Sequence, residues 1–219
     1  MSSIKYLLII LALCIPVSVQ AVEPQAEMAQ GVPLSPGHLT VLGVTVGAHT
    51  LNDAVDRLGP AEVFQNGPDG AASFRVCYTS PDKEFPAKIV FEAGPQGLRK
   101  EITSIKLIAG QVRFEEASRC AASELVTTEP GTMTGLRIGM TTEAFKAMLG
   151  APTDEGPDRV EYEFHTRKML SADEVERLKG TWPYVKQYPY LDVYSSVTAR
   201  FHEGSLVRLV LSSIETETR

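Results

Sequence analysis

A chain of 219 residues with 43% hydrophobic and 22% charged residues is typical of a folded protein of one or two domains, and it excludes an intrinsically disordered chain. The formal net charge is −6 and the sequence has no basic tract, which argues against a nucleic-acid-binding protein and against attachment to an anionic membrane surface.

Residues 1–21 have the features of a secretory signal peptide. Lys5 supplies a positive start, an apolar run follows from Tyr6 to Leu13, and Val19-Gln20-Ala21 is a small-residue cleavage site. Lys5 is the only charged residue in this segment, so cleavage changes the net charge from −6 to −7. No later stretch approaches the roughly 20 apolar residues of a membrane-spanning helix. We therefore predict an exported, periplasmic protein without a transmembrane segment.

The cysteines allow two further predictions. Leu11-Ala12-Leu13-Cys14 resembles a lipobox, but the residue before the cysteine should be small, so ordinary cleavage is favoured and an outer-membrane lipoprotein through Cys14 is the alternative. Cleavage after residue 21 would leave Cys77 and Cys120. An even pair in an oxidising compartment predicts a disulfide.

Residues 22–37 contain three prolines and predict a flexible lead-in, and residues 38–112 form the first structural unit. In the latter, apolar residues at positions 51, 54, 55 and 58 predict an amphipathic helix over Thr50–Leu58. Strands are expected over 73–79, 88–92 and 102–108, because apolar residues alternate or cluster there between turn residues.

Residues 113–134 are polar and rich in small residues, which predicts a linker to a second unit over 135–219. That unit opens with a two-turn helix that Thr141 caps and Gly150 ends, followed by Pro152. Strands are expected over 159–165, 197–202 and 206–212, the last two joined by the turn Glu203-Gly204.

The two units share an order of glycine, threonine, helix, Leu-Gly and proline, which appears in Gly43–Pro60 and again in Gly135–Pro152. This recurrence predicts a tandem repeat. Gly139-Met140-Thr141, Phe145 and Leu149-Gly150-Ala151-Pro152 resemble the signature of the BamE (SmpA/OmlA) outer-membrane assembly lipoproteins, although Phe145 replaces a branched aliphatic residue. The doubling also resembles the β-lactamase inhibitor protein. Both resemblances imply an α+β fold in which short helical segments pack on antiparallel sheet.

The second unit is longer than the first between matched strands. Tyr78 and Phe91 are 13 positions apart, whereas Phe164 and Phe201 are 37 apart, so the second unit is 24 residues longer, and we place this aromatic insertion within 166–190. Ser171-Ala172-Asp173-Glu174 is a capping box that predicts a short helix to about Lys179.

The insertion contains the only tryptophan and a cluster of tyrosines beside Pro183 and Pro189. Large aromatic side chains dominate interaction hot spots, so we predict a protein-binding segment. The alternative is a lid folded back on the sheet. The predicted binding residues are Trp182, Tyr184, Tyr188 and Tyr190.

No catalytic motif is present, and no cofactor is expected. His165 and His202 lie on the polar phase of their strands with Glu163 nearby, which would suit a metal if the strands were neighbours, but a solvated sheet face is favoured. His38 and His49 are assigned no role.

The predicted function is a non-enzymatic periplasmic protein-binding module that acts on another periplasmic or outer-membrane protein, in outer-membrane or envelope assembly or maintenance, as the resemblance implies. A proteinaceous inhibitor of a hydrolase and a small periplasmic metal-dependent enzyme are the alternatives. The oligomeric state stays open.

Overall fold

The computed structural model describes residues 34–67, 72–82, 84–94, 101–114 and 119–217. The predicted signal peptide, Cys14 and the lead-in up to residue 33 lie outside this range. The elements in chain order are the 3-10 helix η1 (Pro36–Leu39), β1 (Thr40–Val41), β2 (Val44–Thr45), α1 (Leu51–Leu58), β3 (Phe64–Asn66), β4 (Ser73–Thr79), β5 (Lys88–Ala93), β6 (Ile102–Ile108), β7 (Ala121–Ala122), α2 (Thr142–Leu149), β8 (Asp154–Glu155), β9 (Arg159–Met169), α3 (Ala172–Leu178), β10 (Tyr190–His202) and β11 (Ser205–Glu217).

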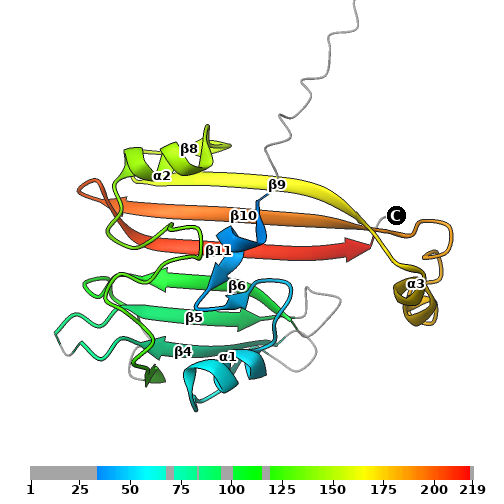
Figure 1. Cartoon of the computed structure of the whole chain (residues 1–219), viewed down its shortest axis with the longest axis horizontal. Helices are drawn as coiled ribbons and strands as arrows, with labels where there is room; N and C mark the ends of the chain where they lie inside the picture. Colours follow the sequence, from blue (N-terminus) through cyan, green and yellow to red (C-terminus); the bar gives the residue numbers. More distant parts are fainter. Residues whose placement is uncertain (1–33, 68–71, 83, 95–100, 115–118, 218–219) are drawn as a thin grey trace, which may run out of the picture.

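Strands from both halves of the chain form one sheet in the order β3-β4-β5-β6-β11-β10-β9-β8, with β7 added in parallel beside β4 (Figure 1). Every other neighbouring pair in this sheet is antiparallel. The halves meet where β11 pairs with β6, from Arg208 opposite Ile108 to Ser212 opposite Ser104. The predicted α+β class, with short helices on antiparallel strands, is therefore confirmed.

One face of this sheet carries the main hydrophobic core, which both halves share. Period-2 alternation directs Val76 and Tyr78 of β4 and Val160 and Tyr162 of β9 to this face, and all four are buried. Helices α1 and α2 and the η1–β2 segment cover it (Figure 1). Phe145 of α2 is fully buried, with its ring centroid 6.1 Å from that of Tyr162.

Hydroxyl side chains cap the starts of the three α-helices, and two of these caps, Thr141 and Ser171, were predicted. Thr50 caps α1 in a capping box with Asp53, and its backbone N–H donates to Asp53 Oδ2 at 2.7 Å. This hydrogen bond lowers the pKa of the Asp53 carboxyl. Thr141 accepts from the Ala144 N–H at the start of α2. A capping box between Ser171 and Glu174 begins α3, as predicted.

The ends of α1 and α2 are tied to the sheet in the same way. Gly59 and Gly150 follow the two helices with φ of 103° and 83°. The Tyr78 hydroxyl donates to the Gly59 carbonyl at 2.7 Å, and the Tyr162 hydroxyl donates to the Gly150 carbonyl at 2.9 Å. Burial raises the pKa of Tyr78 to about 12 and also raises that of Tyr162. The same hydrogen bond at the end of each helix agrees with a tandem repeat, and the repeat itself stays a prediction.

We expect Gly150→Val to lower the free energy of unfolding by about 1–3 kcal/mol, because φ of 83° with ψ of −150° is a backbone region that essentially only glycine occupies. A Cβ at this position would meet no atom within 4 Å, so the cost lies in the backbone. Gly180→Val is the control, since that glycine has no positive φ and also faces open space. Urea denaturation of both variants measures the difference, and equal midpoints would contradict the prediction.

Two segments predicted to be irregular take part in the fold. Residues 36 and 37 of the predicted lead-in belong to η1. Within the predicted linker, β7 pairs with β4, Val126 joins the main core, and the Ser123 hydroxyl donates to the Leu58 carbonyl at 3.0 Å. These residues pack because the linker must pass around the β4 edge of the sheet. Its composition is polar, but its backbone hydrogen bonds are made with the sheet.

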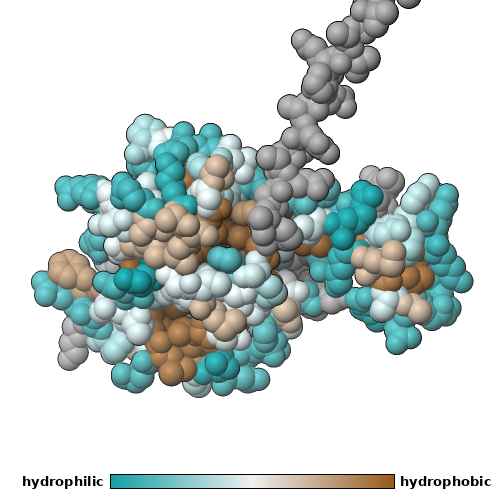
Figure 2. Space-filling view, turned by 45° about the horizontal axis from the view of Figure 1, so that its top comes forward, coloured by the Kyte–Doolittle hydropathy of each residue, from teal (hydrophilic) through white to brown (hydrophobic). Residues whose placement is uncertain are grey.

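The predicted insertion 166–190 begins and ends inside regular strands. Strand β9 continues to Met169 and β10 begins at Tyr190, so the first half has no counterpart of their outer ends. We call residues 164–169, 190–195 and 213–217 the arm, because they extend the sheet beyond the β6–β11 pairing. Residues 170–189 at the tip form the lobe, which stands apart from the body (Figure 2).

Candidate functional site

The face of the sheet opposite the main core is termed the open face. Side chains alternate along each strand, so strand register arranges the open-face residues in rows that cross several strands. One row runs from Glu163 on β9 through Ser196 and Ser212 to Ser104 on β6 and Glu92 on β5. Both halves of the chain thus contribute to one continuous surface.

The chain after β6 covers one side of the open face. Val112 and Phe114 pack on a second small core of Phe64, Cys77, Val90 and Ile108, and the predicted disulfide between Cys77 and Cys120 is present beside it. The Lys88 ammonium lies under this cover and donates to the carbonyl oxygens of Gly110 and Val112, 3.4 and 3.5 Å away. Burial lowers the pKa of Lys88.

Next to this cover, the open face forms a groove of about 450 Å³. Its small residues come from the row described above, and Ser104 Oγ lies buried without a hydrogen-bond partner among the described residues. Glu92 accepts from Lys106 Nζ at 2.7 Å, so the charges in the groove are paired. The lining residues are Ser73, Glu92, Ala93, Gly94, Thr103, Ser104, Lys106, Val210, Ser212 and Ile214.

The open face continues from the groove onto the arm, where aromatic and charged side chains form a ladder. His165 stacks on Tyr194 with ring centroids 4.6 Å apart, and Arg167 lies over the Tyr190 ring at 5.9 Å. Asp192 joins the two pairs, since its Oδ1 lies 3.2 Å from His165 Nε2 and 3.1 Å from Arg167 Nε. Met169, opposite Tyr190, is 66% exposed. The ladder therefore presents a preorganised, largely exposed surface.

The four predicted binding residues divide into two groups. Trp182 is only 2% exposed and packs with Leu170, Val185 and Leu191 in a third core inside the lobe. Its prediction as a contact residue is corrected, because the lobe has too few other apolar side chains to fold without it. Tyr184 and Tyr188 are exposed, and Tyr190 is half-buried in the ladder.

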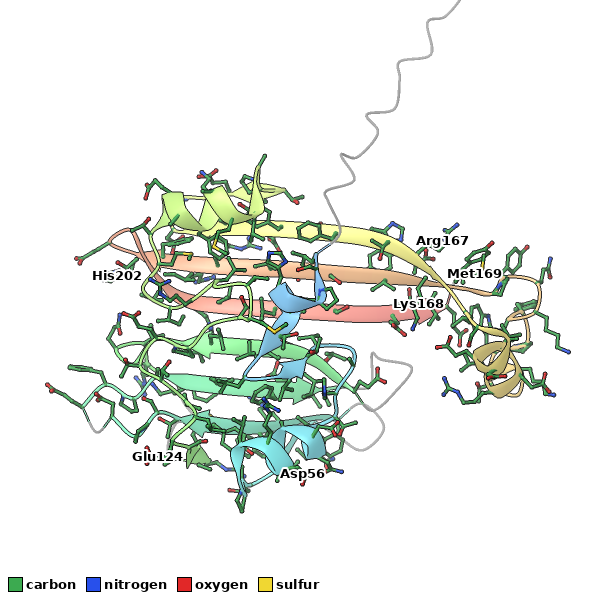
Figure 3. The ribbon with its side chains drawn as sticks, in the orientation of Figure 1. Asp56, Glu124, Arg167, Lys168, Met169 and His202 are labelled. Atoms are coloured by element: carbon green, nitrogen blue, oxygen red, sulfur yellow. A yellow bond between two sulfur atoms is a disulfide. The ribbon has the colours of Figure 1, made fainter. Side chains whose placement is uncertain are left out.

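The two histidines considered for a metal site, for which a solvated sheet face was favoured, are far apart. Strands β9 and β10 are neighbours, but His165 registers with Tyr194, eight residues along β10 from His202. At about 3.3 Å per residue this separates the two by roughly 26 Å. His202 lies at the end of the sheet opposite the arm (Figure 3). Among the described residues, no group of three His, Cys, Asp or Glu side chains is placed to hold a metal ion.

The ladder was not predicted from the sequence, although β9 contributes Arg167 and Met169 in the same alternation as His165. Ladder formation depends on the register that sets Asp192 opposite Arg167, and no sequence pattern specifies that register. The available signal was the run of alternating residues that continues past His165 into the predicted insertion.

No family model, curated protein or solved structure matches this chain. None of the helices in the described part of the chain is long and apolar enough to cross a membrane.

Proposed function

We propose that this protein is a non-enzymatic protein-binding module of the periplasm, acting in envelope assembly or maintenance. The observation that supports it is the continuity of the open face, from the groove through Ile214 and Tyr194 to Met169. Tyrosine, methionine and arginine are enriched at protein interfaces, and all three occur on the arm. The signal peptide predicted at residues 1–21 supports the compartment.

The arm holds its contact residues rigidly, which favours recognition of a partner. Asp192 positions both His165 and Arg167, and stacking fixes Tyr194, so these side chains have little rotamer entropy left to lose on binding. A flexible loop with the same residues would bind more weakly. The lobe adds Tyr184 and Tyr188 at the tip of this surface.

Site-specific photo-crosslinking in cells tests the proposal. A photoreactive residue at Tyr194 or Tyr184 is expected to capture a discrete partner, whereas one at Val63 or Leu125 is not, although these two controls are also about half exposed. Glu124, the neighbour of Leu125, lies on the body away from the arm (Figure 3). Equal capture from all four positions would contradict the proposal. A hydrolase as the captured partner would favour the inhibitor function.

We also expect the double variant Tyr194→Ala and Met169→Ala to lose at least about thirtyfold in affinity for the captured partner, because truncating central contact residues typically costs about 2 kcal/mol or more, and 2 kcal/mol corresponds to about thirtyfold. Both side chains are at least half exposed, so the melting temperature should change little. A titration of the purified partner measures the affinity. An unchanged affinity would show that the arm is not part of the interface.

A further inference from the structure

The open face contains a row of arginines near the β10–β11 hairpin. Arg159 on β9 registers with Arg200 on β10, and Arg200 registers with Arg208 on β11. Like charges directly opposite one another across antiparallel strands are destabilising. A β-bulge follows Arg200, and bulges re-aim side chains next to functional sites.

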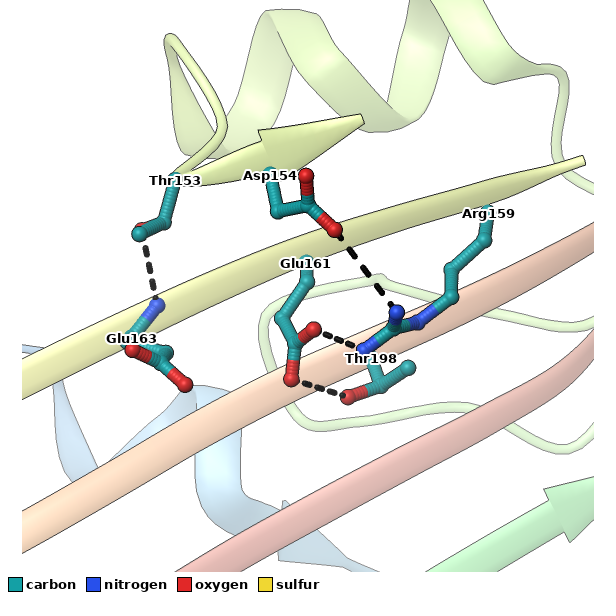
Figure 4. Close-up of polar contacts among 6 residues, drawn as sticks. All are labelled: Thr153, Asp154, Arg159, Glu161, Glu163 and Thr198. Atoms are coloured by element: carbon teal, nitrogen blue, oxygen red, sulfur yellow. Dashed lines mark hydrogen bonds and ion pairs between the residues drawn. The ribbon is translucent and has the colours of Figure 1, made fainter. Parts of the chain in front are cut away.

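The sheet neutralises Arg159 with its own carboxylates. Its guanidinium lies 3.6 Å from Asp154 Oδ2 and forms an ion pair with Glu161, which also accepts from Thr198 Oγ1 at 3.4 Å (Figure 4). Acidic side chains on β8 and β9 therefore neutralise the charge of the one arginine of this row that lies beside them.

Arg200 and Arg208 receive no such carboxylate from the described residues. Arg200 is exposed and makes no ion pair with them. Arg208 Nε is buried from solvent and has no hydrogen-bond partner among them. On its other side Arg208 registers with Ile108, which belongs to the second small core. A buried donor without an acceptor is costly. Arg208 as a whole is only partly buried, so its terminal guanidinium nitrogens, unlike Nε, are left for a partner.

We infer that Arg200 and Arg208 form a receptor for a carboxylate of the partner protein, supplied by an aspartate or glutamate side chain. This inference rests on the proposed protein-binding function and adds the chemistry of the partner, which is acidic where it meets the hairpin end of the open face. Guanidinium groups bind carboxylates through paired N–H donors, and Arg159 shows that a carboxylate is accommodated beside this row.

A blocked hexaglutamate peptide is the probe for the site itself. Its titration should shift the NMR signal of the Arg208 Nε–H, while a hexaglutamine peptide should not. The Arg167 Nε–H, already bonded to Asp192, is the internal control and should stay in place. Inorganic phosphate is titrated in parallel. A response to phosphate without a response to hexaglutamate overturns the carboxylate receptor.

The variant Arg200→Glu supplies the missing carboxylate from within the chain. It should raise the melting temperature by about 1–3 °C, because a like-charge pair becomes an opposite-charge pair, and it should abolish the hexaglutamate response. Arg200→Gln, which removes a charge without supplying a carboxylate, should raise the melting temperature less. A lower melting temperature for Arg200→Glu than for Arg200→Gln overturns the inference.

Partner capture separates this inference from the proposed function. With the photoreactive residue at Tyr184, Arg200→Glu should reduce partner affinity about tenfold or more. Capture that is unaffected by Arg200→Glu refutes the receptor and leaves the protein-binding function standing. If the wild-type chain captures no partner but hexaglutamate shifts Arg208, the proposed function fails and the carboxylate site remains.

Discussion

Trp182→Ala should unfold the lobe while the body of the protein stays folded. The indole is nearly fully buried against Leu170, Val185 and Leu191, and truncating a buried tryptophan typically costs about 3–5 kcal/mol. The lobe has its own core, separate from the main one, and projects from the body (Figure 2). A small core that loses its largest member has little stability left, so the unfolding is expected to be local.

Hydrogen exchange measures this effect by region. In Trp182→Ala the amides of residues 170–189 should exchange without protection, while those of β5 and β6 keep the wild-type rates. Tyr184→Ala is the matched control, because Tyr184 lies two residues away and is 65% exposed. Protection of the lobe that survives the loss of Trp182 would contradict the structure. Unfolding of the lobe should also weaken partner capture, because the exposed tyrosines would lose their fixed positions. Trp182 therefore supports the exposed tyrosines and does not contact the partner itself.

Removal of the disulfide should have the second large effect. In the double variant Cys77→Ala and Cys120→Ala, the free energy of unfolding is expected to fall by about 4 kcal/mol, since the bond closes a loop of 43 residues in the unfolded chain. The bond also fastens the segment after β6 over the open face, where Phe114 packs on the second small core. Its loss should loosen that cover.

Denaturant unfolding of the oxidised wild type and the double variant gives the difference in stability. A chain starting at Val22 contains only these two cysteines, so thiol titration of the unfolded, unreduced protein should find none. Two free thiols, or equal unfolding midpoints, would contradict the bond. Arg119, next to Cys120, lies over the Phe64 ring at 4.3 Å, so Arg119→Ala is a control for lost packing without loss of the bond.

Local signals in the sequence predicted the helices well. Thr141 and Ser171 cap their α-helices as expected, and Gly150 has the positive φ that its place after a helix suggested. Capping depends on residues within one turn, so a single sequence contains the whole interaction. The disulfide was predicted for a comparable reason, because two cysteines allow only one pairing.

The candidate site was predicted only in part. Tyr184 and Tyr188 are exposed as the binding hypothesis requires, whereas Trp182 is buried, and composition cannot tell an aromatic anchor from an aromatic core. Whether His165 and His202 could meet, the less favoured alternative, was open for a different reason. Both residues lie on the polar phase, but which residues face each other depends on strand register, which set Tyr194 beside His165.

By itself, the sequence determined the α+β class, the helix boundaries, the short strands of both halves and the cysteine pair, since each depends on neighbours in the chain or on strict alternation. Only the tertiary structure decided that β6 pairs with β11 to make one sheet, and that β9 and β10 extend into an arm. It also decided which face stays open and that Arg200 and Arg208 lie side by side there. These features arise from pairing between distant strands, whose register is selected by the burial of a whole face at once rather than by any single segment.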